Sequence, residues 1–130
     1  MMKRGFSTLI AALLVMATVG CAKAPPSLSP AGTAAFHATR IVRALDLFRD
    51  AAISANDQSP PLISTNTTRQ IVLYHRSAVT TIGAAPSGWA PVVQTGLAEL
   101  VKNLPAHERQ QLAPYVVLVQ TLIAEVTRDR

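Results

Sequence analysis

Between residue 33 and the C-terminus, apolar side chains recur every three or four positions in four separate stretches. This spacing puts them on one face of a helix, so each stretch predicts an amphipathic helix with one buried side. The first helix is predicted from Thr33 to about Asn56, where a polar, proline-containing segment ends it. Its apolar positions, at spacings of four, three and four, are Ile41, Leu45, Phe48 and Ala52. Charged residues that include Asp46 and Asp50 fall on the opposite side.

The second helix is predicted to begin at Ser64 or Thr67 and to end at Gly83, shortly before Pro86. Thr67 fits a capping box because Gln70 follows three residues later. Ser64 would instead start the helix one turn earlier. The apolar arc of this helix consists of Ile71, Val72, Ala78, Val79 and Ile82.

Prolines bound the third and fourth helices. The third follows Gly88 and tolerates Pro91 in its first turn. Its apolar stripe is Val93, Leu97, Leu100 and Leu104. The fourth runs from Pro105 to about Thr127 and contains Pro114, where we expect a kink or a fresh start because proline removes a helical hydrogen bond. Four helices joined by short loops place antiparallel neighbours side by side, so the predicted fold is an all-α four-helix bundle.

The N-terminus carries a different signal. Lys3 and Arg4 precede a short apolar run that ends in Gly20, and Cys21 follows directly. A charged start, an apolar middle and small residues before a processing point are typical of a secretory signal. With its cysteine, the segment resembles the lipobox of bacterial lipoproteins. The resemblance implies cleavage after Gly20, a diacylglyceryl group on the Cys21 thiol and, because Ala22 rather than an aspartate follows, sorting to the outer membrane.

Two other interpretations of this segment exist: a permanent membrane helix and an ordinary secretory signal. The apolar core is shorter than the roughly 20 residues that cross a bilayer, which disfavours the first. A lone thiol without a disulfide partner disfavours the second, because secreted proteins rarely keep an exposed free cysteine. We therefore expect a lipid-anchored envelope protein, on the periplasmic face of the outer membrane.

This interpretation divides the chain into three parts. Residues 1–20 form the cleaved signal, residues 21–32 a lipidated cysteine with a tether rich in proline and serine, and residues 33–130 the helical domain. After cleavage, ten Lys and Arg face seven Asp and Glu, a balance of +3. The basic residues are scattered and aromatic residues are few, so we expect no nucleic-acid partner. One cysteine permits neither a disulfide nor a cysteine-based metal site.

Two histidines are the candidate polar residues of the core. His75 falls in the middle of the second helix's apolar arc, and His37 lies toward the edge of the first helix's apolar face. They either bond to backbone carbonyls or to Gln and Thr of neighbouring helices, or meet across the bundle to ligate a metal or sense pH. We favour the structural role and expect no metal or other cofactor. Glu108, beside His107 at a helix start, is explained by helix capping.

Trp89, in the loop before the third helix, either closes the end of the bundle or projects as a binding anchor. Leu73 and Tyr74 lie off the main apolar arc of their helix, where they either pack or form an exposed edge for a partner. We favour packing for both. Gly96 is predicted to let another helix approach closely, because it has no side chain.

The helical domain shows no nucleophile elbow, glycine-rich phosphate loop or paired carboxylates, so we expect no catalytic activity. The first hypothesis for its function is a non-catalytic domain that contacts envelope proteins. The alternative is a carrier that holds an apolar small molecule or lipid between its helices. An enzyme would require His75 to lie within hydrogen-bond reach of an acid in an open cleft.

Overall fold

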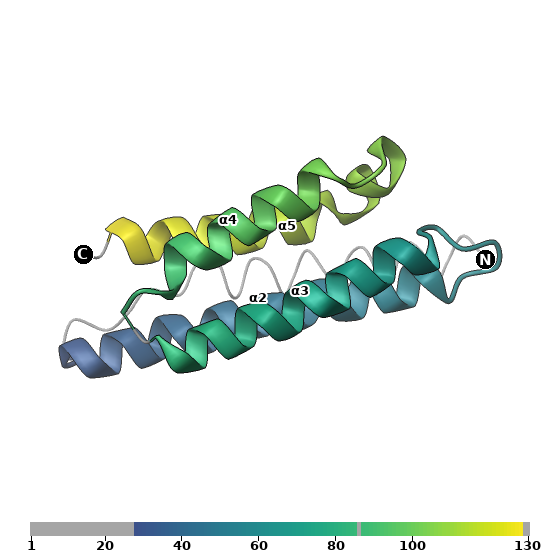
Figure 1. Cartoon of the computed structure of the whole chain (residues 1–130). Helices are drawn as coiled ribbons and strands as arrows, with labels where there is room; N and C mark the ends of the chain where they lie inside the picture. The colour runs from purple at the N-terminus through teal and green to yellow at the C-terminus, as the bar shows by residue number, and fades with distance from the viewer. Residues whose placement is uncertain (1–27, 86, 129–130) are drawn as a thin grey trace.

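The computed structural model describes residues 28–85 and 87–128, and this part of the chain forms four helices and no strand (Figure 1). The helices are α2 (Pro30–Asn56), α3 (Thr65–Ala84), α4 (Trp89–Lys102) and α5 (Ala106–Arg128). The predicted all-α class and the number of helices are confirmed.

The helices form an antiparallel bundle of two layers. α2 and α3 lie side by side in one layer, and α4 and α5 form the other (Figure 1). α2 also packs against α5, and α3 against α4, so each helix contacts both of its neighbours. The start of α2, the α3–α4 connection and the end of α5 therefore share one end of the bundle. The α2–α3 loop and the α4–α5 connection share the other.

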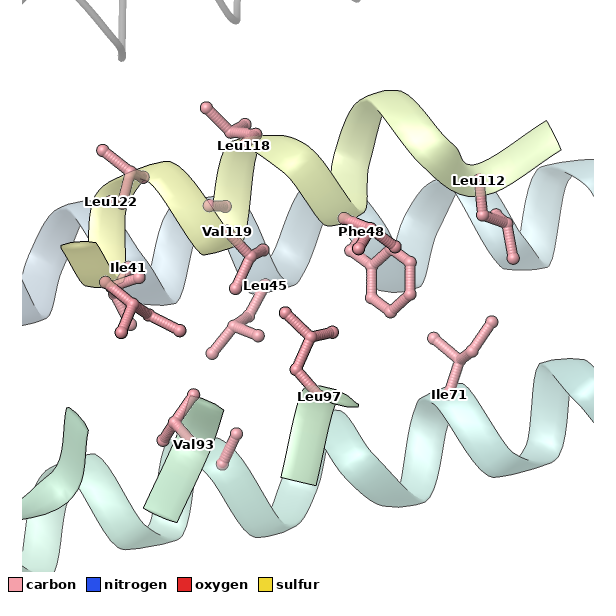
Figure 2. Close-up of a cluster of buried hydrophobic side chains, with 14 of the residues drawn as sticks. Ile41, Leu45, Phe48, Ile71, Val93, Leu97, Leu112, Leu118, Val119 and Leu122 are labelled. Carbon is pink, nitrogen blue, oxygen red and sulfur yellow. The ribbon is translucent and has the colours of Figure 1, made fainter. Parts of the chain in front are cut away.

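Aliphatic side chains from all four helices fill the centre of the bundle, and Phe48 adds the largest of the fully buried side chains (Figure 2). The largest side chains with almost no exposed surface are Ile41, Leu45, Phe48, Ile63, Ile71, Val93, Leu97, Leu112, Val119 and Leu122. Most stand at the three- and four-residue spacings that predicted the helices. Burial of such side chains contributes about 1.5–3 kcal/mol each, so this core is the main source of stability.

One helix begins earlier than predicted, and one residue predicted to lie in a loop is helical. α2 begins at Pro30 rather than at residue 33, because Ser29 caps the helix by accepting a hydrogen bond from the Gly32 amide (3.1 Å) and Pro30 suits the first helical position. Residues 30–32, predicted as tether, are thus helical. α4 begins at Trp89, which was predicted to lie in a loop.

α5 continues through Pro114 without a fresh start. Pro114 removes the hydrogen bond that the carbonyl of Gln110 would accept. Both residues are exposed, so water can satisfy that carbonyl, and the apolar residues on the other side keep the helix packed.

No helix within residues 28–85 and 87–128 has the length and apolar character that crossing a membrane requires. The predicted signal, Cys21 and the tether up to residue 27 lie outside the described residues.

Candidate functional site

His75 is buried on α3 and faces Asp46 on α2. Its Nε2 lies 2.6 Å from the Asp46 Oδ1, and Arg49 Nη1 approaches the same nitrogen at 3.4 Å. Arg49 also lies 3.9 Å from Asp46 and binds the Asp50 carboxylate through Nε (3.1 Å). The four side chains form a polar network between α2 and α3, which we call the His75 network.

The partner of His75 differs from the expected backbone carbonyl, glutamine or threonine. Asp46 was placed on the polar side of its helix, but it lies at the edge of that side, where an aspartate can reach across to α3. Because a buried imidazole needs partners for its ring nitrogens, this contact provides the partner of the His75 Nε2.

One condition for the enzymatic alternative is met, since His75 lies within hydrogen-bond reach of an acid. The imidazole itself is poorly accessible, because its side chain is only 11% exposed, whereas that of Asp46 is 42% exposed. The network therefore meets solvent through Asp46, Arg49 and Asp50, and the His75 ring lies between the helices.

The two histidines are buried but are not brought together. His37 lies nine positions before Asp46 on α2, about 14 Å along the helix axis at 1.5 Å per residue. Instead, His37 packs edge-on against Phe36, with ring centroids 5.7 Å apart. Within the described ranges, no group of three or more His, Cys, Asp or Glu side chains is arranged to hold a metal ion.

Glu108, in the first turn of α5, is buried and reaches the start of α3. One carboxylate oxygen accepts the backbone amide hydrogen of Ser64, and the other accepts the Thr67 hydroxyl hydrogen at 2.8 Å. Ser64 is the N-cap of α3, and its Oγ accepts the Thr67 amide hydrogen at 3.1 Å. Of the two residues predicted to start this helix, Ser64 is therefore the one that does so.

This arrangement resembles a capping box whose acidic member comes from another helix. In an ordinary capping box, the acid three residues after the cap accepts the cap's amide hydrogen. Here Glu108 takes that role from α5, and Thr67 occupies the position of the acid. Glu108 was predicted to cap its own helix; its carboxylate instead accepts hydrogen bonds at the start of α3 and joins two helices at this end of the bundle.

The surroundings of Glu108 act on its pKa in opposite directions. Burial raises the pKa, but the hydrogen bonds from Ser64 and Thr67, together with the nearby charge of His107, lower it by more. The net result is a pKa below the ordinary 4.5, so the carboxylate is ionised at neutral pH. An ionised acceptor gives stronger hydrogen bonds than a neutral one.

A third polar group joins α2 to α5 near the opposite end. Arg40 Nη1 lies 2.9 Å from Glu125 Oε2, and both side chains are largely buried. The Arg40 guanidinium also stacks over Phe36, 5.3 Å from the ring centroid. A paired guanidinium on an aromatic face is a stabilising arrangement in a partly dry environment.

Trp89 and Tyr74 take the packing roles that were favoured. Trp89 is buried at the start of α4 and closes the core there. Tyr74 donates its hydroxyl hydrogen to the Val93 carbonyl (2.9 Å) across the α3–α4 interface, and burial raises its pKa. A Cβ on Gly96 would stand 3.1 Å from the Tyr74 ring, which confirms that the glycine permits close approach. Leu73, for which packing was also favoured, is instead exposed.

Sequence reasoning missed the burial of Glu108, although the chain carries a signal for it. Glu108 precedes Leu112 by four residues, and Leu112 precedes Val116 by four, so the acid continues the apolar stripe of α5. An acid at such a position predicts a buried polar contact.

No family model, curated protein or solved structure matches this chain, so no relative bears on its function.

Proposed function

We propose that this chain is a lipid-anchored protein of the bacterial cell envelope, whose helical bundle has a non-catalytic role in contacts with other envelope components. The observation that carries the proposal is the order of residues at the N-terminus. Lys3 and Arg4, the short apolar run and Gly20 stand in the order of a secretory signal, and Cys21 follows it as in the lipobox that this segment resembles.

The segment after Cys21 supports the anchor. Residues 22–29 contain Pro25 and Pro26 and lead directly into α2. A short proline-containing connection suits a domain held close to, but clear of, a membrane surface.

The polar groups of the bundle support a structural assignment for the domain. His75 bonds to Asp46, Glu108 to the start of α3, and Arg40 to Glu125. Each of these contacts joins two helices, so these polar side chains help to hold the bundle together.

The proposal is tested with Cys21→Ser in cells grown with a labelled fatty acid. The wild-type protein should incorporate the label and sediment with the membranes. The Cys21→Ser variant should do neither, because serine offers no thiol for the diacylglyceryl group.

A matched control moves the cysteine within the same segment. The double variant Cys21→Ser/Ser27→Cys keeps the composition of the wild type but places the thiol six residues farther from the apolar run. It should remain unlabelled. Labelling of either variant, or an unlabelled wild type, contradicts lipidation at Cys21.

A further inference from the structure

The segment that follows Cys21 joins the bundle at one particular end. Ser29 caps α2 there, and the α3–α4 connection and the end of α5 lie at the same end (Figure 1). We call this the tether end and define it by residues 28–32, 83–85, 87–88 and 125–128. The far end comprises the α2–α3 loop, residues 57–64, and the α4–α5 connection, residues 102–106.

The length of chain before α2 limits how an anchored bundle can stand. Eight Cα–Cα steps separate Cys21 from Ser29, which span at most about 29 Å when fully extended. α2 has 27 residues and is about 40 Å long. The segment from Cys21 to Ser29 is thus shorter than α2. If lipid is attached at Cys21, the far end of the bundle therefore cannot lie on the membrane with the helices perpendicular to it.

A bundle lying on its side would need one face that binds the bilayer. Helices that lie in the interface carry an apolar stripe along one side. Each helix carries one large apolar residue that is exposed: Ile53 on α2, Leu73 on α3, Val92 on α4 and Val117 on α5. No single helix of the described bundle therefore carries an exposed stripe of large apolar side chains.

The connections at the two ends differ in charge. At the tether end, the sequence from Gly83 to Gly88 contains no ionisable side chain, and the exposed charged side chain of the described end of α5 is that of Arg128, which Asp129 and Arg130 follow in sequence. Glu125 is paired with Arg40. A neutral loop approaches headgroups without the cost of desolvating a charge, and an arginine is attracted to their phosphates.

The far end exposes charges of both signs. They are Asp57, Lys102 and, beside the α4–α5 connection, Arg109. One exposed leucine lies at each end, Leu28 and Leu62, so these two residues do not distinguish the ends.

We infer that the bundle stands on the membrane by its tether end, with the α3–α4 connection against the lipid headgroups and the far end directed away from the bilayer. This inference rests on the proposed lipidation of Cys21. It directs the far end, with the α2–α3 loop and the α4–α5 connection, toward other envelope components.

The test uses the full lipidated chain with one added cysteine at each end. Lipidation converts the Cys21 thiol to a thioether, so a thiol-reactive fluorophore labels only Ala84→Cys at the tether end or Gln58→Cys at the far end, both at exposed positions. Each labelled protein is bound to phosphatidylethanolamine and phosphatidylglycerol vesicles that carry a quencher on the headgroup. The fluorophore at residue 84 should be quenched several-fold more than that at residue 58.

Equal quenching at the two positions, or stronger quenching at residue 58, would overturn the end-on orientation while leaving the anchor intact. The unbound control is each labelled protein with the additional change Cys21→Ser, which removes the site of acylation and leaves the added cysteine as the only thiol. This control should show no quenching at either position. Failure of the wild-type chain to bind vesicles would overturn the proposed lipidation together with this orientation.

Discussion

Replacing Glu108 by alanine tests whether this residue holds α5 to the start of α3. The change removes both oxygens of the carboxylate and so leaves the Ser64 amide and the Thr67 hydroxyl without their acceptor. Glu108 is only 2% exposed, so the carboxylate interacts with these groups and not with bulk water.

The expected loss is worked from these two hydrogen bonds. A buried donor left without a partner costs about 1–3 kcal/mol. Ser64 is an exposed residue, and water can reach its amide once the side chain of Glu108 is gone. The cost of each of the two donors therefore lies at the lower end of that range, about 1 kcal/mol. We therefore expect Glu108→Ala to lower the free energy of unfolding by about 2 kcal/mol, a large share of the roughly 5–15 kcal/mol typical of a domain.

The assay is urea unfolding followed by circular dichroism, with all variants made in the Cys21→Ser background to avoid the lipid. Glu99→Ala is the matched control, because Glu99 is an exposed helical glutamate. It should change the free energy of unfolding by no more than about 0.5 kcal/mol. A Glu108→Ala loss as small as that of the control would refute the cross-helix cap.

Acid pH provides a second arm of the same test. The folded-state pKa of Glu108 lies below its ordinary value of 4.5, so the ionised carboxylate contributes stability above pH 4.5. That contribution is lost as the pH falls through the lowered folded-state pKa. The difference in unfolding free energy between wild type and Glu108→Gln should thus be constant from about pH 7 to about pH 5 and shrink below pH 4.5. A difference that grows on acidification contradicts the hydrogen bonding described.

Three further changes test the helix interfaces by the same unfolding assay. Gly83→Ala should stabilise the bundle by about 0.5–1 kcal/mol, because no atom lies near the added Cβ. Gly96→Ala should give no such gain, because its Cβ would press on the Tyr74 ring, and equal gains from the two changes would refute the close approach of α3 and α4 at Gly96. Tyr74→Phe should cost about 0.5–1.5 kcal/mol through loss of its hydrogen bond, and an unchanged midpoint would contradict that contact. His75→Leu should leave the bundle folded, and a double-mutant cycle with Asp46→Ala should show a coupling of about 0.5–1.5 kcal/mol; zero coupling would contradict the 2.6 Å contact.

The positions of the helices were predictable because their signal is local. Ile41, Leu45 and Phe48 show a buried face within three turns, and the same holds for Val93 and Leu97 on α4. The start of α2 was missed by three residues because proline and glycine near Pro30 resemble a loop, although Ser29 followed by proline is also a helix start.

The partners of the polar side chains were not predictable, because they depend on how the helices are aligned with one another. The apolar arc placed His75 inside, but Asp46 lies 29 residues away in sequence and meets it only through the alignment of α2 with α3. The same is true of Glu108 and Ser64, which are 44 residues apart. Periodicity shows which side of a helix is buried, but not which residue of a neighbouring helix lies opposite.

Mass spectrometry of the protein purified from the envelope of a diderm bacterium tests the lipid anchor most directly. The proposal predicts a chain that begins at Cys21, with a diacylglyceryl group on sulfur and an acyl group on the new amino terminus. A chain that still begins at Met1, a cut at any other bond, or an unmodified Cys21 thiol would contradict it.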